Sequence, residues 1–491
     1  MELRVLRYFL AVARGENITK AAALLHVTQP TLSRQLMQLE NELGVKLFRR
    51  SQYRVVLTDD GMLLRRRAQE IIELADKAER ELQHHEEELT GEVENDAVFN
   101  RNARLSERFN VSIQAIPMTG DCGSIYTALV QYATAGDDFC DVAAQEVWNF
   151  HMATAAGIYQ NWNDTKYIHP DKPWWNQQIN DGATFNGKLF GLTGSFSVTY
   201  MTSTTAIYVN SALLQNHGLT EADLYALVLD GGWTIDYLST LVEGMYRDIN
   251  GDGSRDENDQ YGFGANWYYS DTWCSAFDIP VTGKAADGTL EIKLMQEKTY
   301  DALSKVYKLY YENNGVYFWE NWTGFMDYFT GGTLVFAQGT LDDAFNALRD
   351  MEDPFGIVPQ PKYDEAQDGY HCLVADGYFI VGMPTTVTDT DFVSLMTEAM
   401  AAETYTNVYP VYYDVALKSK YSKDEATASM IDLISAGAAF DVSFMYGTYL
   451  EMLPYMFRGC LNEKTTDIAS TYAKAESKID KALGKIYAMY E

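Results

Sequence analysis

An acidic loop in the middle of the chain carries oxygen-bearing side chains at the spacing of a calcium site. Between Asp248 and Asp259 such side chains stand at loop positions 1, 3, 5, 9 and 12, with Gly253 at position 6. They belong to Asp248, Asn250, Asp252, Asp256 and Asp259, and Ser254 at position 7 offers its backbone carbonyl. Calcium loops usually end on a bidentate glutamate, where this chain has the shorter Asp259. The spacing predicts a structural calcium ion, and an ordinary Asn-Gly and Asp-Gly turn is the alternative.

A second group of polar side chains lies on one face of a helix predicted from Thr28 to Glu42. Leucines recur every three or four residues along it and predict one buried stripe: Leu32, Leu36, Leu39 and Leu43. Thr28 suits the N-cap, and Pro30 sits in the first turn, where no N–H is needed. Side chains able to reach base edges or phosphates share the opposite face: Gln29, Thr31, Ser33, Arg34 and Gln38. The face predicts a DNA-reading helix, with a solvated surface helix as the alternative.

The elements around this helix suit a helix-turn-helix with a hairpin. Apolar spacing predicts a first helix over residues 3–13 and a short, alanine-rich second helix over residues 18–25. After the recognition helix, residues 46–57 have the pattern of two short strands, with Arg50 and Arg54 among the cations at the tip. Such a tip suits a wing over phosphates or the minor groove.

A long helix is predicted from Thr58, with Thr58 as its cap. Its apolar seam has heptad spacing: Leu64, Ala68, Ile71, Ala75, Ala78, Leu82, His85 and Leu89. We expect the seam to join two copies of the chain, giving a homodimer or a higher oligomer on a two-fold symmetric site. His85 is either a pH-sensitive interface residue or a solvated histidine near the helix end.

Charge is divided unevenly along the chain. The net charge is −31, yet residues 1–67 hold twelve Lys and Arg against six Asp and Glu. A basic head on an acidic body indicates that only the head binds phosphates. The five cysteines are scattered, which favours isolated thiols over a disulfide framework. The start of the chain lacks a signal-peptide pattern, and no apolar stretch approaches the about 20 residues that span a membrane. We expect a cytoplasmic protein without membrane contact.

Sequence patterns of catalysis are missing. The chain has no G-x-S-x-G, no H-E-x-x-H and no P-loop pattern, and nothing pairs two of its many carboxylates as acid and base. We therefore expect no enzymatic activity.

The N-terminal part closely resembles the DNA-binding domain of LysR-type transcriptional regulators. The matching positions are Phe9, Ala21, Ala22, Leu25, residues 28–33, Leu39, Glu40, Leu43, Gly44, residues 47–50 and residues 57–61. The resemblance implies an all-α winged helix-turn-helix over residues 1–60 and a linker helix over residues 61–90 that pairs two subunits. It places Gln29, Thr31, Ser33 and Arg34 in the major groove of double-stranded DNA, and Arg50 and Arg54 on the backbone or minor groove.

Residues 91–491 change in composition and resemble a second family. Strand-like runs alternate with helical stretches and favour an α/β body; they lie at residues 111–116, 188–192, 333–337 and 378–383. The body is similar to family 1 extracellular solute-binding proteins of ABC importers, which bind sugars and oligosaccharides. The similarity rests on residues 95–98, 100–102, 107–111, 190–192, 208–210, 232–234, 329–333, 359–363 and 376–378. It implies two α/β lobes, as in periplasmic binding proteins, that close over a solute by a hinge.

Several aromatic and carboxylate residues of the body suit sugar recognition, which needs flat apolar faces beside planar hydrogen-bonding groups. The candidates are Trp148, Trp175, Tyr200, Trp267, Asp271, Trp273 and Asp376. For any single tryptophan, packing in the core is the alternative.

The two resemblances do not usually occur in one chain. A solute-binding protein begins with a signal peptide and a first strand inside its first lobe, and this body begins after both, with Val93 as its one apolar residue there. Loss of an interior strand leaves sheet edges exposed. Three hypotheses follow: a LysR-type regulator with a sugar- or solute-sensing body, a carbohydrate-binding component of an importer, and a chimeric gene product without a sensor.

Overall fold

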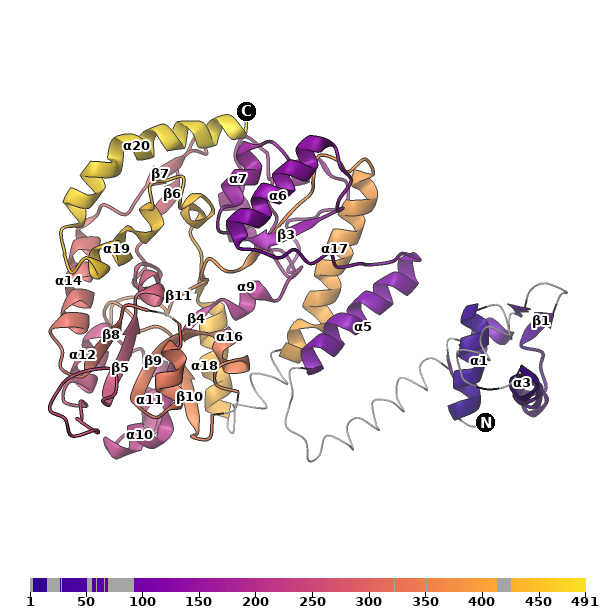
Figure 1. Cartoon of the computed structure of the whole chain (residues 1–491), viewed down its shortest axis with the longest axis horizontal. Helices are drawn as coiled ribbons and strands as arrows, with labels where there is room; N and C mark the ends of the chain where they lie inside the picture. Colours follow the sequence, from indigo (N-terminus) through magenta and orange to yellow (C-terminus); the bar gives the residue numbers. More distant parts are fainter. Residues whose placement is uncertain are drawn as a thin grey trace. The chain divides into compact units, whose positions relative to one another are not determined.

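The computed structural model describes residues 3–15, 27, 29–50, 55–58, 60–65, 67–68, 92–321, 323–349, 351–412 and 425–491. The chain divides into two compact units, Met1–Thr90 and Gly91–Glu491. Figure 1 shows the helices and strands of each unit.

In the described part of the first unit, two helices share a leucine-rich core. α1 spans Leu3–Gly15 and α3 spans Gln29–Leu43. Their buried side chains include Leu6, Phe9, Val12, Leu32, Leu36 and Leu39, which confirms the core of the predicted stripe. Leu43 was predicted in the same stripe, and that prediction is wrong, since its side chain is 39% exposed. The reason is that α3 ends at Leu43 and Gly44 turns the chain away with a φ of 70°.

Two short strands follow α3 and are tied to it by one carboxylate. β1 (Phe48–Arg50) pairs antiparallel with β2 (Val55–Leu57). Glu40 is 4% exposed and accepts hydrogen bonds from Lys46 Nζ at 2.9 Å and from the backbone N–H groups of Leu47 and Phe48 at 2.9 and 3.2 Å. The end of α3 is thereby fastened to β1.

Part of the predicted N-terminal architecture lies outside the described residues. This applies to the second helix at residues 18–25 and to most of the linker helix with its seam, including His85. The start of the linker helix is described: Thr58 Oγ1 accepts a hydrogen bond from the Gly61 N–H at 3.0 Å, which is the predicted cap.

The second unit contains a five-stranded sheet in the order β10-β4-β9-β5-β8. The strands are β4 (Thr205–Asn210), β5 (Tyr261–Asn266), β8 (Val316–Trp319), β9 (Leu334–Thr340) and β10 (Phe355–Val358). β4 runs antiparallel to β9 and β10, whereas β5 runs parallel to β8 and β9. β4 and β5 are buried along their whole length, as expected for strands covered on both faces. β9 confirms the strand predicted at residues 333–337.

A smaller sheet stands apart from the first in the same unit. β3 (Ala143–Glu146) pairs antiparallel with β12 (Phe379–Gly382), and Leu192 bridges to Val381 on β12. β12 confirms the strand predicted at residues 378–383. The prediction of a strand at residues 188–192 is wrong, because among the described residues this run forms isolated β-bridges and no continuous ladder. The strand predicted at residues 111–116 is also wrong, because the run pairs with no described strand.

Helices surround both sheets and connect them. α5 (Glu92–Phe109) packs along α17 (Thr390–Asn407), as Figure 1 shows. Arg101 of α5 donates a hydrogen bond to Thr404 of α17 at 2.8 Å. The other helices of the body are α6 (Cys122–Ala135), α7 (Phe150–Ala155), α8 (Gln177–Ala183), α9 (Thr199–Thr202), α10 (Ser211–Asn216), α11 (Glu221–Leu229), α12 (Ile235–Val242), α13 (Thr272–Ala276), α14 (Glu297–Tyr311), α15 (Phe325–Thr330), α16 (Leu341–Phe345), α18 (Glu425–Ala436), α19 (Met456–Asn462) and α20 (Ile468–Met489). The remaining strand pairs are β6 (Thr282–Lys284) with β7 (Leu290–Ile292) and β11 (Cys372–Leu373) with β13 (Ala438–Ala439).

The five cysteines are all free thiols, as the sequence predicts. Cys274, Cys372 and Cys460 are buried, and Cys122 and Cys140 are half-buried. Burial raises the pKa of Cys122 and Cys140 to about 11 and that of Cys372 to about 12. Burial also raises the pKa of Cys274 and Cys460.

Candidate functional site

Most polar side chains of α3 are exposed to solvent, whereas its leucines Leu32, Leu36 and Leu39 are buried. Gln29, Thr31, Arg34 and Gln38 are exposed, and Ser33 is half-buried. Five of the predicted DNA-binding residues thus lie on α3, and four of them are exposed. The others lie outside what the structure describes: Thr28, the side chains of Pro30 and Arg50, and Arg54.

Four of the predicted ligand-binding residues of the body gather around Arg458 and Tyr455. The resulting group, called the Arg458 cluster below, consists of Trp148, Trp267, Asp271, Asp376, Tyr455 and Arg458. The Arg458 guanidinium contacts two rings, 4.7 Å from the Trp267 centroid and 4.6 Å from the Tyr455 centroid. Tyr455 donates a hydrogen bond to Asp376 Oδ2 at 2.6 Å, and its ring meets Trp148 edge to face at 5.2 Å. Segments far apart in the sequence therefore meet at one cation.

The electrostatics of the cluster centre on Asp271. Burial raises the pKa of its carboxyl to about 8, with Asp376 adding to the rise and Arg458 opposing it. Asp271 Oδ2 pairs with Arg458, whereas the buried Oδ1 has no hydrogen-bond partner among the described residues. A buried oxygen without a partner costs free energy that a bound hydroxyl or N–H donor would recover.

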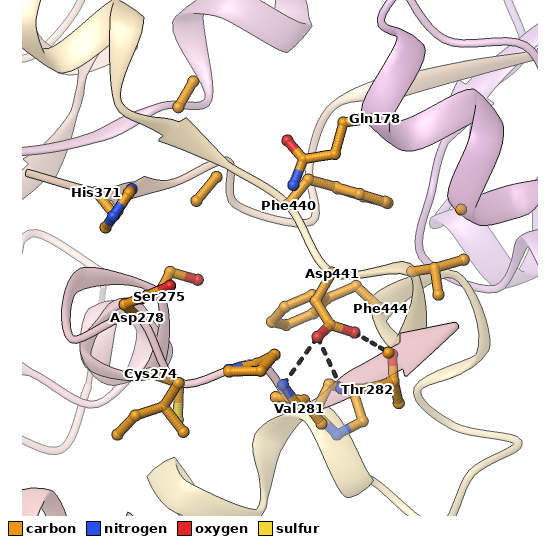
Figure 2. A pocket seen from close by; sticks show the side chains of 18 of the residues that line it. Gln178, Cys274, Ser275, Asp278, Val281, Thr282, His371, Phe440, Asp441 and Phe444 are labelled. Atoms are coloured by element: carbon orange, nitrogen blue, oxygen red, sulfur yellow. Dashed lines mark hydrogen bonds between the residues drawn. The ribbon is translucent and has the colours of Figure 1, made fainter. Parts of the chain in front are cut away.

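Asp271 is one of the residues that line a cavity of about 480 Å³. Figure 2 shows this cavity from close by. This volume lies in the range of small-molecule sites, about 300–1,000 Å³. Its walls carry Gln178, Lys284, His371, Phe440, Asp441 and Phe444. Asp441 accepts hydrogen bonds from the N–H groups of Val281 and Thr282, both at 2.9 Å, and from Thr282 Oγ1 at 2.6 Å, as the dashed lines in Figure 2 show. The cavity combines two phenyl rings with several polar groups, which suits a polar solute with an apolar face.

Three other predicted ligand-binding residues are not part of this group. Trp273 is fully buried and donates from Nε1 to Tyr310 Oη at 2.6 Å. Trp175 is 3% exposed and donates from Nε1 to Glu398 at 2.7 Å. Both indoles pack in the hydrophobic core with their one donor satisfied, which corrects their proposed place on a ligand surface. The half-buried Tyr200 instead accepts a hydrogen bond from Asn176 at 2.6 Å.

The predicted calcium loop is folded tightly by its own side chains. Asp248 accepts hydrogen bonds from the N–H groups of Gly251 at 2.7 Å and Gly253 at 3.0 Å. Both glycines have positive φ, 72° and 74°, which the turn requires. Asp259 is fully buried; its Oδ2 accepts from Tyr246 Oη at 2.9 Å, and its Oδ1 is a buried oxygen without a described partner. Among the residues that the structure describes, no three His, Cys, Asp or Glu side chains are gathered as a metal site.

The sequence reading missed Arg458, Tyr455 and Asp441. Arg458 is one of the few cations of an acidic body and follows an aromatic pair, Tyr455 and Phe457. Asp441 stands between Phe440 and Phe444. A search for charged residues flanked by aromatic ones would have selected both.

These features define two classes of domain, a helix-turn-helix DNA-binding domain and a two-lobe solute-binding fold. Residues 3–62 match the family described as "Bacterial regulatory helix-turn-helix protein, lysR family", so the chain carries an N-terminal domain of the LysR type. The HTH-type transcriptional regulator BsdA of Bacillus subtilis (strain 168) is 47% identical over 92 residues, which cover 18% of this chain and 32% of the relative. The chain thus spans about a third of the length of that curated relative.

The body is similar in fold to solved solute-binding proteins. UgpB from Mycobacterium tuberculosis, in complex with glycerophosphocholine, has a TM-score of 0.55 at 15% identity, covering 79% of this chain and 95% of that one. An ABC transporter solute-binding protein from Thermotoga lettingae, bound with alpha-D-tagatose, has a TM-score of 0.53 at 14% identity, covering 80% and 97%. At such identities the likeness shows the two-lobe fold. No described helix has the length and apolar character needed to cross a bilayer.

Proposed function

We propose that this chain is a transcription regulator of the LysR type that reads double-stranded DNA with α3. The observation that carries the proposal is the exposed row of Gln29, Thr31, Arg34 and Gln38 above a buried leucine core. The basic balance of residues 1–67 and the family match over residues 3–62 support it. In this proposal the β1–β2 hairpin is the wing, Arg50 and Arg54 contact the DNA backbone or minor groove, and the linker helix of residues 61–90 joins two copies in the cytoplasm.

A gel shift with the full chain tests the DNA-binding proposal. DNA selected by the chain from a random pool serves as the probe. Arg34→Ala should weaken binding about tenfold or more, since one good contact to a base is worth about 1–3 kcal/mol. Arg108→Ala removes the same charge from an exposed position on α5 and is the matched control. Equal binding by the wild type and Arg34→Ala would refute the assignment of α3.

We propose further that the cavity beside the Arg458 cluster binds a polar solute such as a sugar, and that the solute sets the affinity for DNA. Two features support this proposal: the cavity is lined by Asp271, whose buried Oδ1 has no partner among the described residues, and by the Phe440 and Phe444 rings. The ligands of the two structural neighbours, glycerophosphocholine and tagatose, suggest the first compounds to test.

Thermal shift with a panel of sugars and glycerophosphodiesters separates the remaining hypotheses. A sensor predicts that one solute raises the melting temperature of the full chain and also changes its gel shift. An importer component predicts the first effect without the second, and a chimeric product without a sensor predicts neither. Asp271→Asn should remove the solute effect, whereas Asp287→Asn, on the exposed β6–β7 turn, should keep it.

We also propose that the loop from Asp248 to Asp259 binds a calcium ion with a structural role. The all-oxygen donor set, the two left-handed glycines and the unpartnered Asp259 Oδ1 support the fit. The donors are Asp248, Asn250, Asp252, the Ser254 carbonyl, Asp256 and Asp259. Isothermal titration should show one calcium ion per chain and a raised melting temperature. Asp252→Asn should weaken binding, Asp287→Asn in another Asp-Gly turn should not, and absence of saturable binding by the wild type would reject the site.

A further inference from the structure

Among the described residues, the strand β3 pairs with another strand along one of its two edges, and that strand is β12. The Val147 N–H donates to the Tyr378 carbonyl at 2.9 Å, so the backbone groups of Ala143 and Gln145 also point toward β12. The groups of Ala144 and Glu146 point to the opposite edge. There the Glu146 carbonyl accepts a hydrogen bond from Tyr126 Oη at 2.7 Å, and no described strand pairs with Ala144. Within the described part of the chain, the edge of the sheet at Ala144 is therefore open.

A cavity of about 570 Å³ adjoins this open edge. Residues 143–145 of β3 line one side of it, and the unpaired run Val111–Ile116 lines another. Apolar side chains complete the walls: Leu129 of α6, Phe139, and Val393, Met396 and Met400 of α17. The cavity therefore lies where a strand beside β3 would lie. The helices α6 and α17 contribute to its lining.

The dimensions of the cavity match one short strand. A four-residue strand in an inter-strand spacing of about 4.8 Å, between layers about 10 Å apart, takes up about 600 Å³. A strand covered by helices is apolar on both faces. Two carboxylates, Asp138 and Asp141, line the cavity against one cation, Arg101, and the chain as a whole carries a net charge of −31, so basic flanking residues would complement it.

We propose that this cavity is a binding site for an extended peptide segment of another protein, which pairs with Ala144 and completes the sheet of β3 and β12. The ligand is a run of about four consecutive apolar residues, rich in β-branched side chains and flanked by lysine or arginine. Recognition is by strand addition: main-chain hydrogen bonds supply affinity, and the apolar walls supply selectivity. This site is separate from the DNA-reading helix and from the cavity beside the Arg458 cluster.

The test uses the full chain and a fluorescein-labelled peptide with a core of four alternating valines and isoleucines between lysine pairs. Fluorescence anisotropy should show saturable binding of one peptide per chain. Hydrogen exchange should slow at residues 143–145 and 111–116 and remain unchanged on α3. A control peptide with prolines at the two central positions keeps the charge but cannot pair, and it should bind at least tenfold more weakly.

Two variants locate the binding. Ile113→Glu places a charge on the cavity wall and should weaken binding at least tenfold. Phe99→Glu makes the same kind of change on α5, where the side chain is 70% exposed and outside the cavity, and should leave binding unchanged. Equal affinity of the two peptides for the wild type, or exchange protection elsewhere, would overturn the proposal. The peptide comparison uses the unaltered chain, so a variant that fails to fold does not decide the outcome.

Discussion

Arg458 Nη1 lies 2.8 Å from Asp271 Oδ2, and the two side chains are 10% and 6% exposed. The pair links α19 to the end of the 3₁₀ turn after β5. Removing one partner of a buried pair leaves the other charge without compensation, whereas removing both can be nearly neutral.

Above pH 8, where the Asp271 carboxyl with its pKa of about 8 is ionised, Arg458→Met should therefore lower the free energy of unfolding of the body by about 3–5 kcal/mol. Denaturant unfolding of the full chain, followed by tryptophan fluorescence, measures this loss. The double variant Asp271→Leu with Arg458→Met should recover most of it. If Arg458→Met unfolds at the same denaturant concentration as the wild type, the pair does not stabilise the body.

The raised pKa of Asp271 makes the stability of the body depend on pH. The folded value of about 8 lies above the ordinary 3.8, so between these values the folded state keeps a proton that the unfolded state has lost. Stability must then fall as pH rises from about 4 to about 8. Melting temperatures across this range should show the wild type losing stability relative to Asp271→Asn, with no further loss above pH 8. Parallel curves of melting temperature against pH for the two proteins would contradict the raised pKa of Asp271.

Glu40 is expected to hold the DNA-binding domain together at the junction of α3 and β1. Although burial raises its pKa, hydrogen bonds from Lys46 and from the N–H groups of Leu47 and Phe48 outweigh burial and lower it overall. Glu40→Ala should cost about 1–3 kcal/mol, because two buried N–H groups lose their acceptor. The temperature at which DNA binding is lost reports the effect, and Glu42→Ala, at an exposed position, is the control. The stabilisation by Glu40 should also fade as pH falls through its lowered pKa.

The stripe of α3 gives a matched pair of leucines. Leu36→Ala should destabilise the first unit by about 2–5 kcal/mol, since the side chain is fully buried. Leu43→Ala should have a much smaller effect, since its side chain is 39% exposed. The fraction of chain active in DNA binding after graded heating compares the two. Similar losses would place Leu43 in the core, as the spacing alone predicts.

Asp441 should support the wall of the cavity in Figure 2. It accepts three hydrogen bonds from Val281 and Thr282, so Asp441→Ala leaves two backbone N–H groups without their acceptor. We expect a lower melting temperature of the body and a weaker response to any solute that the cavity binds. Asp278→Asn removes the charge of an exposed carboxylate at the same cavity and should keep the melting temperature of the wild type, because asparagine tolerates the φ of 55° at this position.

The sequence predicts local features better than contacts between distant segments. The leucine spacing of α3 and the cap at Thr58 depend on residues within a few positions, and the structure has both apart from Leu43. The gathering of Trp148, Trp267 and Asp376 depends instead on Tyr455 and Arg458, and no local pattern encodes which distant residues these two contact.

Residue type also does not decide whether a given tryptophan packs in the core or lines a ligand surface. Trp175 and Trp273 resemble Trp267 in their polar sequence neighbourhoods, but each finds a partner for its Nε1 in the interior. The strand predicted at residues 111–116 fails for a related reason. Alternating apolar residues favour a strand, yet a strand also needs a neighbour to pair with, and the described chain provides none.

The five free thiols have a practical consequence for spectroscopy. Thiolates are the reactive form, and every cysteine of this chain has its pKa raised by burial, so all five remain protonated and slow to react at neutral pH. Maleimide dyes and spin labels should therefore leave the natural chain largely unmodified. One cysteine introduced at an exposed position of α3, and another on the body, would accept probes selectively. Distances between them would then report whether a solute changes the separation of the two units, without first removing any natural cysteine.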